Sequence, residues 1–345
     1  MVLNLYFLTR NLEYYNEHHI CTEYKIEESG LDIVKSDFVL TKETDAVEGD
    51  FLLAKFRGER EIAYFGVIED FDNEKVECNS LLSLADIEFA ATKVSGKSFE
   101  DYVRRIMNKF IRDDSTKQLS KLEIVAPTNT EHLYQPSDPP TATSMAKYLV
   151  NAFKKYNIVW RLVTLDNGKI ETTLFCATEK IVIEDNIPDV TGWDVQINRA
   201  GKGSENQLLI IGKKTTDSLN PIILATYYLR SDNEITTNKN DSNVVMPTST
   251  KISIYDTEDE NKPTYDQVSS ELKGNAYNHQ ISFQVSKDSK ILDVKAMHPG
   301  LLATLIYKGK VINSVLTSKI VDSSSDKVEF TFGNIRNRVV DYLNE

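Results

Sequence analysis

The C-terminal stretch at residues 299–345, PGLLATLIYKGKVINSVLTSKIVDSSSDKVEFTFGNIRNRVVDYLNE, has a counterpart near the other end of the chain. That counterpart is residues 49–89, GDFLLAKFRGEREIAYFGVIEDFDNEKVECNSLLSLADIEF. Each stretch predicts an apolar strand, a basic glycine turn, a second strand, an acidic polar turn, a third strand and a short amphipathic tail. Residues 68–78 align without a gap on residues 320–330 and share Ile, Asp, Lys, Val and Glu. We therefore predict two similar β units in which these two stretches are equivalent hairpins.

Length and charge limit the possible classes of protein. A chain of 345 residues is longer than one hydrophobic core usually supports, so two or more domains are expected. The net charge is −12 and the basic residues are dispersed, which argues against a nucleic-acid-binding face. No apolar run approaches the roughly 20 residues of a membrane span. The N-terminal segment lacks the features of a signal peptide. We expect a protein that is made in the cytoplasm and does not insert into a membrane.

Residues 1–95 predict a first antiparallel β-barrel, because short β-branched or aromatic runs alternate with turn residues. The predicted strands are LNLYFL, TEYKIE, DIVKSDFVLT, DFLLAKF, IAYFGVIEDF and KVECNSL. Residues 96–188 predict an α+β domain. Its elements are a helix after the N-cap Ser98, a strand at 121–126, a second helix at 144–156 and a hairpin around Asp166-Asn167-Gly168.

The second barrel is predicted to be split between residues 189–233 and 277–345. Residues 234–276 between them predict a small inserted subdomain with a short helix at 263–273, which Gly274 ends. The predicted fold class is thus α+β, mainly β: two similar antiparallel β-barrels, an α+β domain between them and a small insertion in the second barrel.

Residues that could carry chemistry show no convergent motif, so we expect no catalytic, cofactor-binding or metal-ligating residues and no cofactor. The five histidines lack the short spacings of a metal site: His18, His19, His132, His279 and His298. The three cysteines are far apart and are expected to be reduced thiols: Cys21, Cys78 and Cys176. The loop at 199–205 lacks the ending of a phosphate loop, and the acidic turn at 70–74 lacks the glycine and distal glutamate of a calcium loop.

The order of a barrel, an α+β domain and a split second barrel resembles the tail-tip hub proteins of phages and prophages. The glycine-led strand at 49–56 and the Phe332-Gly333-Asn334 sequence after the last strand carry this resemblance. The family includes the central baseplate hub of contractile-tailed phages and the tail-associated protein of Gram-positive siphophages. In that family the two barrels are similar, and three copies form a ring of six barrels that extends the tail tube.

The resemblance implies a homotrimeric structural protein of the virion tail, made in the cytoplasm of a bacterial host, and not an enzyme. Its implied partners are the distal tail protein and the tape-measure protein, with receptor-binding proteins as a further option. DNA would pass through the ring without specific binding. Two alternatives remain open. One is a carbohydrate-binding or host-adhesion module, which would use exposed aromatic residues in a cleft and would change the fluorescence of Trp160 or Trp193 when cell-wall sugars bind; the other is a peptidoglycan hydrolase.

Overall fold

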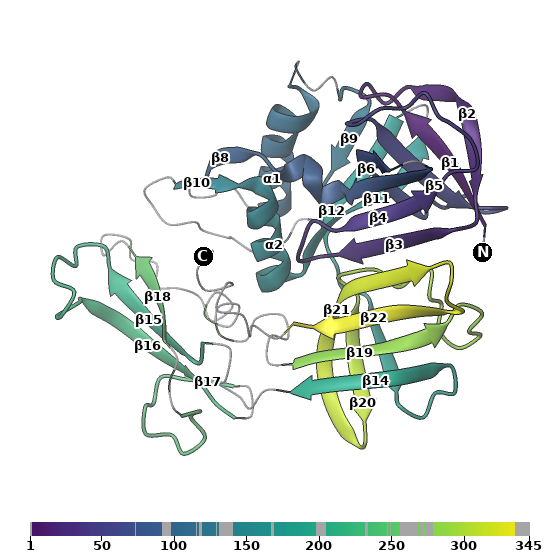
Figure 1. Ribbon diagram of the computed structural model, residues 1–345. Helices are drawn as coiled ribbons and strands as arrows, with labels where there is room; N and C mark the ends of the chain where they lie inside the picture. The colour runs from purple at the N-terminus through teal and green to yellow at the C-terminus, as the bar shows by residue number, and fades with distance from the viewer. Residues whose placement is uncertain are drawn as a thin grey trace.

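The computed structural model describes residues 2–72, 74–91, 98–114, 116, 119–128, 130, 141–166, 169–197, 205–231, 234–246, 248, 250–255, 268, 272 and 279–334. Over this part, the protein is mainly β, with few helices and one large sheet of 13 strands (Figure 1). The six strands predicted for the first barrel belong to this sheet, together with part of the strands predicted for the second barrel. Among the described residues its hydrogen-bonded path runs from Val190–Ile197 (β14) at one end to Tyr14–Cys21 (β2) at the other, and no closed barrel is found there. The predicted organisation in two barrels is therefore not confirmed.

The first half-sheet contains seven antiparallel strands in the spatial order β2-β1-β5-β6-β7-β4-β3. Their bounds are Leu3–Leu8 (β1), Tyr14–Cys21 (β2), Tyr24–Ser29 (β3), Lys35–Val39 (β4), Phe51–Phe56 (β5), Tyr64–Asp72 (β6) and Lys75–Ser80 (β7). The sequence predicted all of these strands except β2. Its segment YYNEHHIC is too polar for an alternating apolar pattern to stand out.

The second half-sheet has the order β13-β20-β21-β22-β19-β14. Its strands are Lys180–Glu184 (β13), Val190–Ile197 (β14), His279–Ser286 (β19), Leu302–Tyr307 (β20), Lys310–Asp322 (β21) and Lys327–Gly333 (β22). Strand β13 lies within the predicted α+β segment 96–188, but it pairs with β20. The half-sheets join where β21 pairs antiparallel with β3, and they share one hydrophobic core (Figure 1).

Between the half-sheets in sequence lies the α+β unit. It contains the helices Phe99–Met107 (α1) and Met145–Tyr156 (α2), a π-helical turn at Asn108–Arg112 (η2) and a 3-10 turn at Leu81–Ala85 (η1). Its strands are Glu88–Ala91 (β8), Leu122–Val125 (β9), Thr141–Ser144 (β10), Ile158–Asp166 (β11) and Lys169–Cys176 (β12). Both helices begin at a serine N-cap, as predicted for Ser98: its Oγ accepts the Asp101 N–H at 3.3 Å, and that of Ser144 accepts the Lys147 N–H at 3.4 Å.

A separate four-stranded sheet has the order β17-β16-β15-β18 and its own small core. Its strands are Gln207–Gly212 (β15), Ile223–Leu229 (β16), Ile235–Thr236 (β17) and Thr250–Tyr255 (β18). Strands β15 and β16 were expected in the second barrel, at 189–233, yet they pair with strands of the expected insertion at 234–276. The inserted unit therefore begins earlier in the chain. Most of the predicted helix at 263–273, and the C-terminal tail after residue 334, lie outside the described residues.

The two half-sheets repeat one strand order, β1-β5-β6-β7-β4-β3 and β13-β20-β21-β22-β19-β14. Strands β5 and β20 are each flanked by two glycines with positive φ. These are Gly49 (+85°) and Gly58 (+87°) around β5, and Gly300 (+99°) and Gly309 (+75°) around β20. Residues with a side chain rarely adopt a positive φ, which explains why glycine recurs at these four positions.

Backbone hydrogen bonds fix the register of the repeat. The Gly49 N–H donates to the Ile68 carbonyl, and the Gly300 N–H donates to the Leu316 carbonyl, both at 2.8 Å. A β-bulge follows each acceptor, between Ile68 and Asp70 and between Leu316 and Ser318. Ile68 is therefore equivalent to Leu316.

The ungapped alignment of 68–78 on 320–330 is thus wrong in register, although both stretches form hairpins. Ile68 pairs with Cys78, and its equivalent Leu316 pairs with Phe332; all four side chains are buried. Beyond the bulge the β21–β22 hairpin is longer. The ungapped alignment matched the residues on either side of the two hairpin turns. The structural register is instead determined by the buried residues and by the bulge.

Candidate functional site

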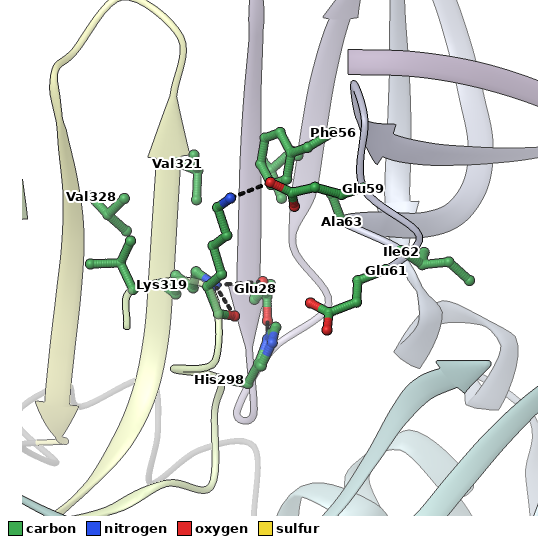
Figure 2. Close-up of a pocket in the computed structure, with 13 residues that line it drawn as sticks. Glu28, Phe56, Glu59, Glu61, Ile62, Ala63, His298, Lys319, Val321 and Val328 are labelled. Carbon is green, nitrogen blue, oxygen red and sulfur yellow. Dashed lines mark hydrogen bonds and ion pairs between the residues drawn. The ribbon is translucent and has the colours of Figure 1, made fainter. Parts of the chain in front are cut away.

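A cluster of charged side chains lies where the two half-sheets meet. We call this the junction site and define it as Glu28, Glu59, Lys295, His298 and Lys319 (Figure 2). Glu28 is on β3 and lies directly opposite Lys319 on β21. The Glu28 carboxylate lies 2.7 Å from His298 Nδ1 and 3.6 Å from Lys319 Nζ. Lys295 forms an ion pair with Glu59. Acidic groups of the first half-sheet thus meet basic groups of the second.

The junction site is partly withdrawn from water. The Lys319 side chain is 6% exposed and that of Glu28 is 24% exposed. Burial alone would raise the pKa of Glu28, but the positive charges of His298 and Lys319 and their hydrogen bonds lower it to about 2. Lys319 Nζ also lies 3.5 Å from the Lys295 carbonyl oxygen, to which it donates. Glu28 is therefore held in its charged form as the centre of an ionic contact between the half-sheets.

The cavity at the junction site measures about 50 Å³. Small-molecule sites usually exceed about 300 Å³, whereas a buried water needs only about 15 Å³. The space beside Glu28 therefore suits a few water molecules and is too small for a cofactor of nucleotide size. Lys319 interrupts an apolar strand, which is a weak signal in the sequence. Nothing in the sequence indicates its partner Glu28, because the two residues lie at opposite ends of the chain.

The described histidines lie in separate places. His18 stacks on the ring of Tyr6, His19 packs edge-on against Phe7, and His298 belongs to the junction site. His279 is buried with Nε2 2.8 Å from Ser314 Oγ, and burial lowers its pKa to about 4. His132 lies outside the described residues. In the ranges that the structure describes, no three His, Cys, Asp or Glu side chains form a group that could hold a metal ion.

The other residues singled out in the sequence are likewise dispersed. The three cysteines are free thiols, and burial raises the pKa of each: Cys21, Cys78 and Cys176. Asp70 and Asp72 of the predicted acidic turn belong to the end of β6, and Asp70 Oδ1 accepts the Phe71 N–H at 2.8 Å. Of the loop at 199–205, only Glu205 is described.

Both tryptophans are half-buried and engaged in packing or hydrogen bonding. Trp160 Nε1 donates to Thr172 Oγ1 at 3.0 Å. The Trp193 ring packs against Phe283 at 4.6 Å and against Tyr307 at 5.4 Å. The contacts of Trp193 occupy ring faces that a sugar would need.

An exposed apolar surface lies on the four-stranded sheet. Ile223, Ile252 and Ile254 are between 54% and 59% exposed. Ile252 and Ile254 lie beside Leu209 and Ile211 on the neighbouring strand, so one face of this sheet is aliphatic. Contiguous exposed aliphatic residues are typical of a protein-interaction surface. No helix in the described part of the chain is long and apolar enough to cross a membrane.

No protein-family model matches the chain, and no curated protein matches its sequence. Solved structures do match along nearly its whole length. The prophage tail protein gp18 from Listeria monocytogenes is 13% identical, with a TM-score of 0.55, over 100% of this chain and 98% of that one. The 43 kDa tail protein of prophage MuSo2 from Shewanella oneidensis is 9% identical, with a TM-score of 0.55, over 97% and 98%. A chain of the p2 virion baseplate in its activated conformation is 12% identical, with a TM-score of 0.51, over 96% and 98%.

At these identities, the likeness defines the fold. The chain has the fold of phage baseplate and prophage tail proteins over nearly its full length, and the resemblance expected from the sequence is confirmed.

Proposed function

We propose that this chain is a structural protein of a phage virion, a trimeric hub at the distal end of the tail. In this role it closes or extends the tail tube and anchors the other tail-tip proteins. The observation that carries the proposal is the match over nearly the whole chain to phage tail and baseplate proteins, in a molecule with two equivalent half-sheets. Each half-sheet would supply one barrel-like unit, so three chains would give a ring of six similar units.

The proposed location is the virion tail, after synthesis in the bacterial cytoplasm. The proposed partners are further copies of the chain, the distal tail protein and the tape-measure protein, with receptor-binding proteins attached outside. The aliphatic face of the four-stranded sheet offers a surface for such contacts. A net charge of −12 suits a tube through which DNA passes without binding, because acidic surfaces repel phosphates. The hub would carry out no catalysis of its own.

Deletion of the gene from its phage or prophage genome tests this proposal. We expect the mutant to produce no infectious tailed particles and expression of the full chain in trans to restore them. In restored virions, mass spectrometry should detect the chain, and gold-labelled antibodies should mark the tail tip. Infectious tailed virions that assemble without the chain would overturn the proposal.

A further inference from the structure

Strands β3 and β21 pair with each other within one chain, whereas the two strands equivalent to them do not pair with each other in the described structure. By the register of the repeat, β21 corresponds to β6 and β3 corresponds to β14. Beyond the bulge, β21 pairs with β22 on one side and with β3 on the other. In the described structure, the same portion of β6 pairs with β7 alone, and β14 pairs with β19 alone. Within the described residues, each chain thus has two open strand edges of complementary position.

We propose that the open edge of β6 in one copy pairs antiparallel with the open edge of β14 in a second copy, in the register that β21 and β3 adopt within the chain. This inference rests on the proposed ring and names the surfaces that form it. The contact joins two different surfaces and is therefore heterologous, so its repetition can close a ring. Exposed strand edges present unpaired N–H and C=O groups, which a second strand satisfies.

The repeat also gives the residues that face each other. Lys319 pairs with Phe330 in the second half-sheet as Phe71 pairs with Val76 in the first, so Phe71 is equivalent to Lys319. Asp37 and Ser282 occupy equivalent positions in the two half-sheets. Lys25 pairs with Asp37, and Asp194 pairs with Ser282. Lys25 is therefore equivalent to Asp194. Three residues further along each strand, Ile197 is equivalent to Glu28. The opposed pair Lys319–Glu28 within the chain thus predicts an opposed pair Phe71–Ile197 between copies.

The chemistry of these positions suits the two kinds of contact. The pair within the chain is ionic, and it is covered by His298 and its neighbours. The predicted pair between copies is apolar. Ile197 is 47% exposed in the single chain, although its neighbour across the ladder, His279, is only 3% exposed. A second copy would remove the exposed isoleucine from water and continue the core in which Phe71 already takes part.

Disulfide trapping tests the register. One chain carries Phe71→Cys, a second carries Ile197→Cys, and both carry Cys176→Ser so that only the buried native thiols remain. Directly opposed residues of an antiparallel pair have Cβ atoms about 5 Å apart, within reach of a disulfide. We expect a cross-linked product between the two chains under mild oxidation. The matched control combines Asp72→Cys with Ile197→Cys. Adjacent residues of a strand point to opposite faces, so this control should give little product.

A second measurement does not depend on new cysteines. Ile197→Asp should convert the ring into monomers in sedimentation velocity, because it places a charge in the apolar contact. Ile291→Asp changes an isoleucine that is 58% exposed in the loop after β19, outside the proposed contact surfaces, and should leave the ring intact.

Equal cross-linking by both cysteine pairs, or a ring that persists in Ile197→Asp, would overturn the edge pairing while the proposed hub function stands. A wild-type chain that stays monomeric at high concentration, together with the absence of a cross-link between the Phe71→Cys and Ile197→Cys chains, would also overturn the edge pairing. The hub function would then be judged by the deletion experiment alone.

Discussion

The two half-sheets have the same backbone plan but different edges. Strand order, flanking glycines and the bulge after Ile68 or Leu316 recur in both. The edge strands differ: β1 runs antiparallel to β5, whereas β13 runs parallel to β20. In the part of the chain that the structure describes, the first half-sheet alone has a further edge strand, β2. The comparison indicates that the repeated central strands form a common frame. The residues on the joining strands differ as well: β21 meets β3 through Lys319 and Glu28, whereas the equivalent positions on β6 and β14 are the apolar residues Phe71 and Ile197.

The two half-sheets also share one core, in which Phe38 and Phe283 occupy equivalent positions. Phe38 packs against Tyr64 at 5.1 Å, and Phe283 packs against Phe332 at 5.4 Å. Because the cores are continuous, we infer that the half-sheets unfold together.

The largest expected effect tests this shared core. Phe38→Ala and Phe283→Ala each remove a fully buried ring and should lower the free energy of unfolding by about 4 kcal/mol. Urea denaturation followed by circular dichroism should show both variants shifting the same transition. Two transitions, each shifted by only one of the variants, would show that the half-sheets unfold independently.

The next effect belongs to the second half-sheet alone. His279 is buried, and its pKa is lowered to about 4 from an ordinary value of 6.5, whereas its equivalent in the first half-sheet is Val34. Between these two values the unfolded chain binds a proton that the folded chain does not. His279 should therefore reduce stability as the pH falls from 6.5 towards 4, by about 3 kcal/mol at most.

The variant His279→Val places the residue of the first half-sheet at this site and should remove that part of the pH dependence. The measurement is the urea midpoint at several pH values above 4.5, where the lowered pKa of Glu28 has little influence. An unchanged slope in the variant would contradict the assignment to His279.

A somewhat smaller effect is expected at the junction site. Glu28→Gln keeps the shape of the side chain but leaves the buried Lys319 without its carboxylate partner. Allowing for the partial exposure of Glu28, we expect a loss of about 2 kcal/mol. The neighbouring Glu27→Gln breaks only the ion pair with Lys25, whose side chain is 45% exposed, and should cost about 0.5 kcal/mol or less. Equal urea midpoints for the two variants would show that the junction does not hold the half-sheets together.

The smallest effects compare the equivalent glycines. Gly49→Ala should cost about 1 kcal/mol, because its positive φ strains any side chain and its new Cβ meets only the flexible Arg10. Gly300→Ala should cost more, because its Cβ would lie 2.7 Å from Val159 Cγ1 in the packed α+β unit. Thermal unfolding midpoints provide the measurement, and a reversed order would contradict the packing described around Gly300.

Much of the fold could be predicted from local patterns. Short apolar runs bounded by turn residues located β1 and β5 closely, and Ser98 marked the start of α1, because these signals act over a few residues. The register of the repeat could not be predicted, since it depends on bulges and buried partners distant in sequence. The same limit applied to β15 and β16, whose apolar pattern suits either sheet, and to the junction of Glu28 with Lys319.

Electron cryo-microscopy of the assembled protein, alone or on isolated tail tips, tests the central claim most directly. We predict a ring of three chains with six similar lobes, in which contacts within and between chains alternate. A single-chain particle on the tail tip, or a ring whose lobes are not formed by the two half-sheets, would contradict the account.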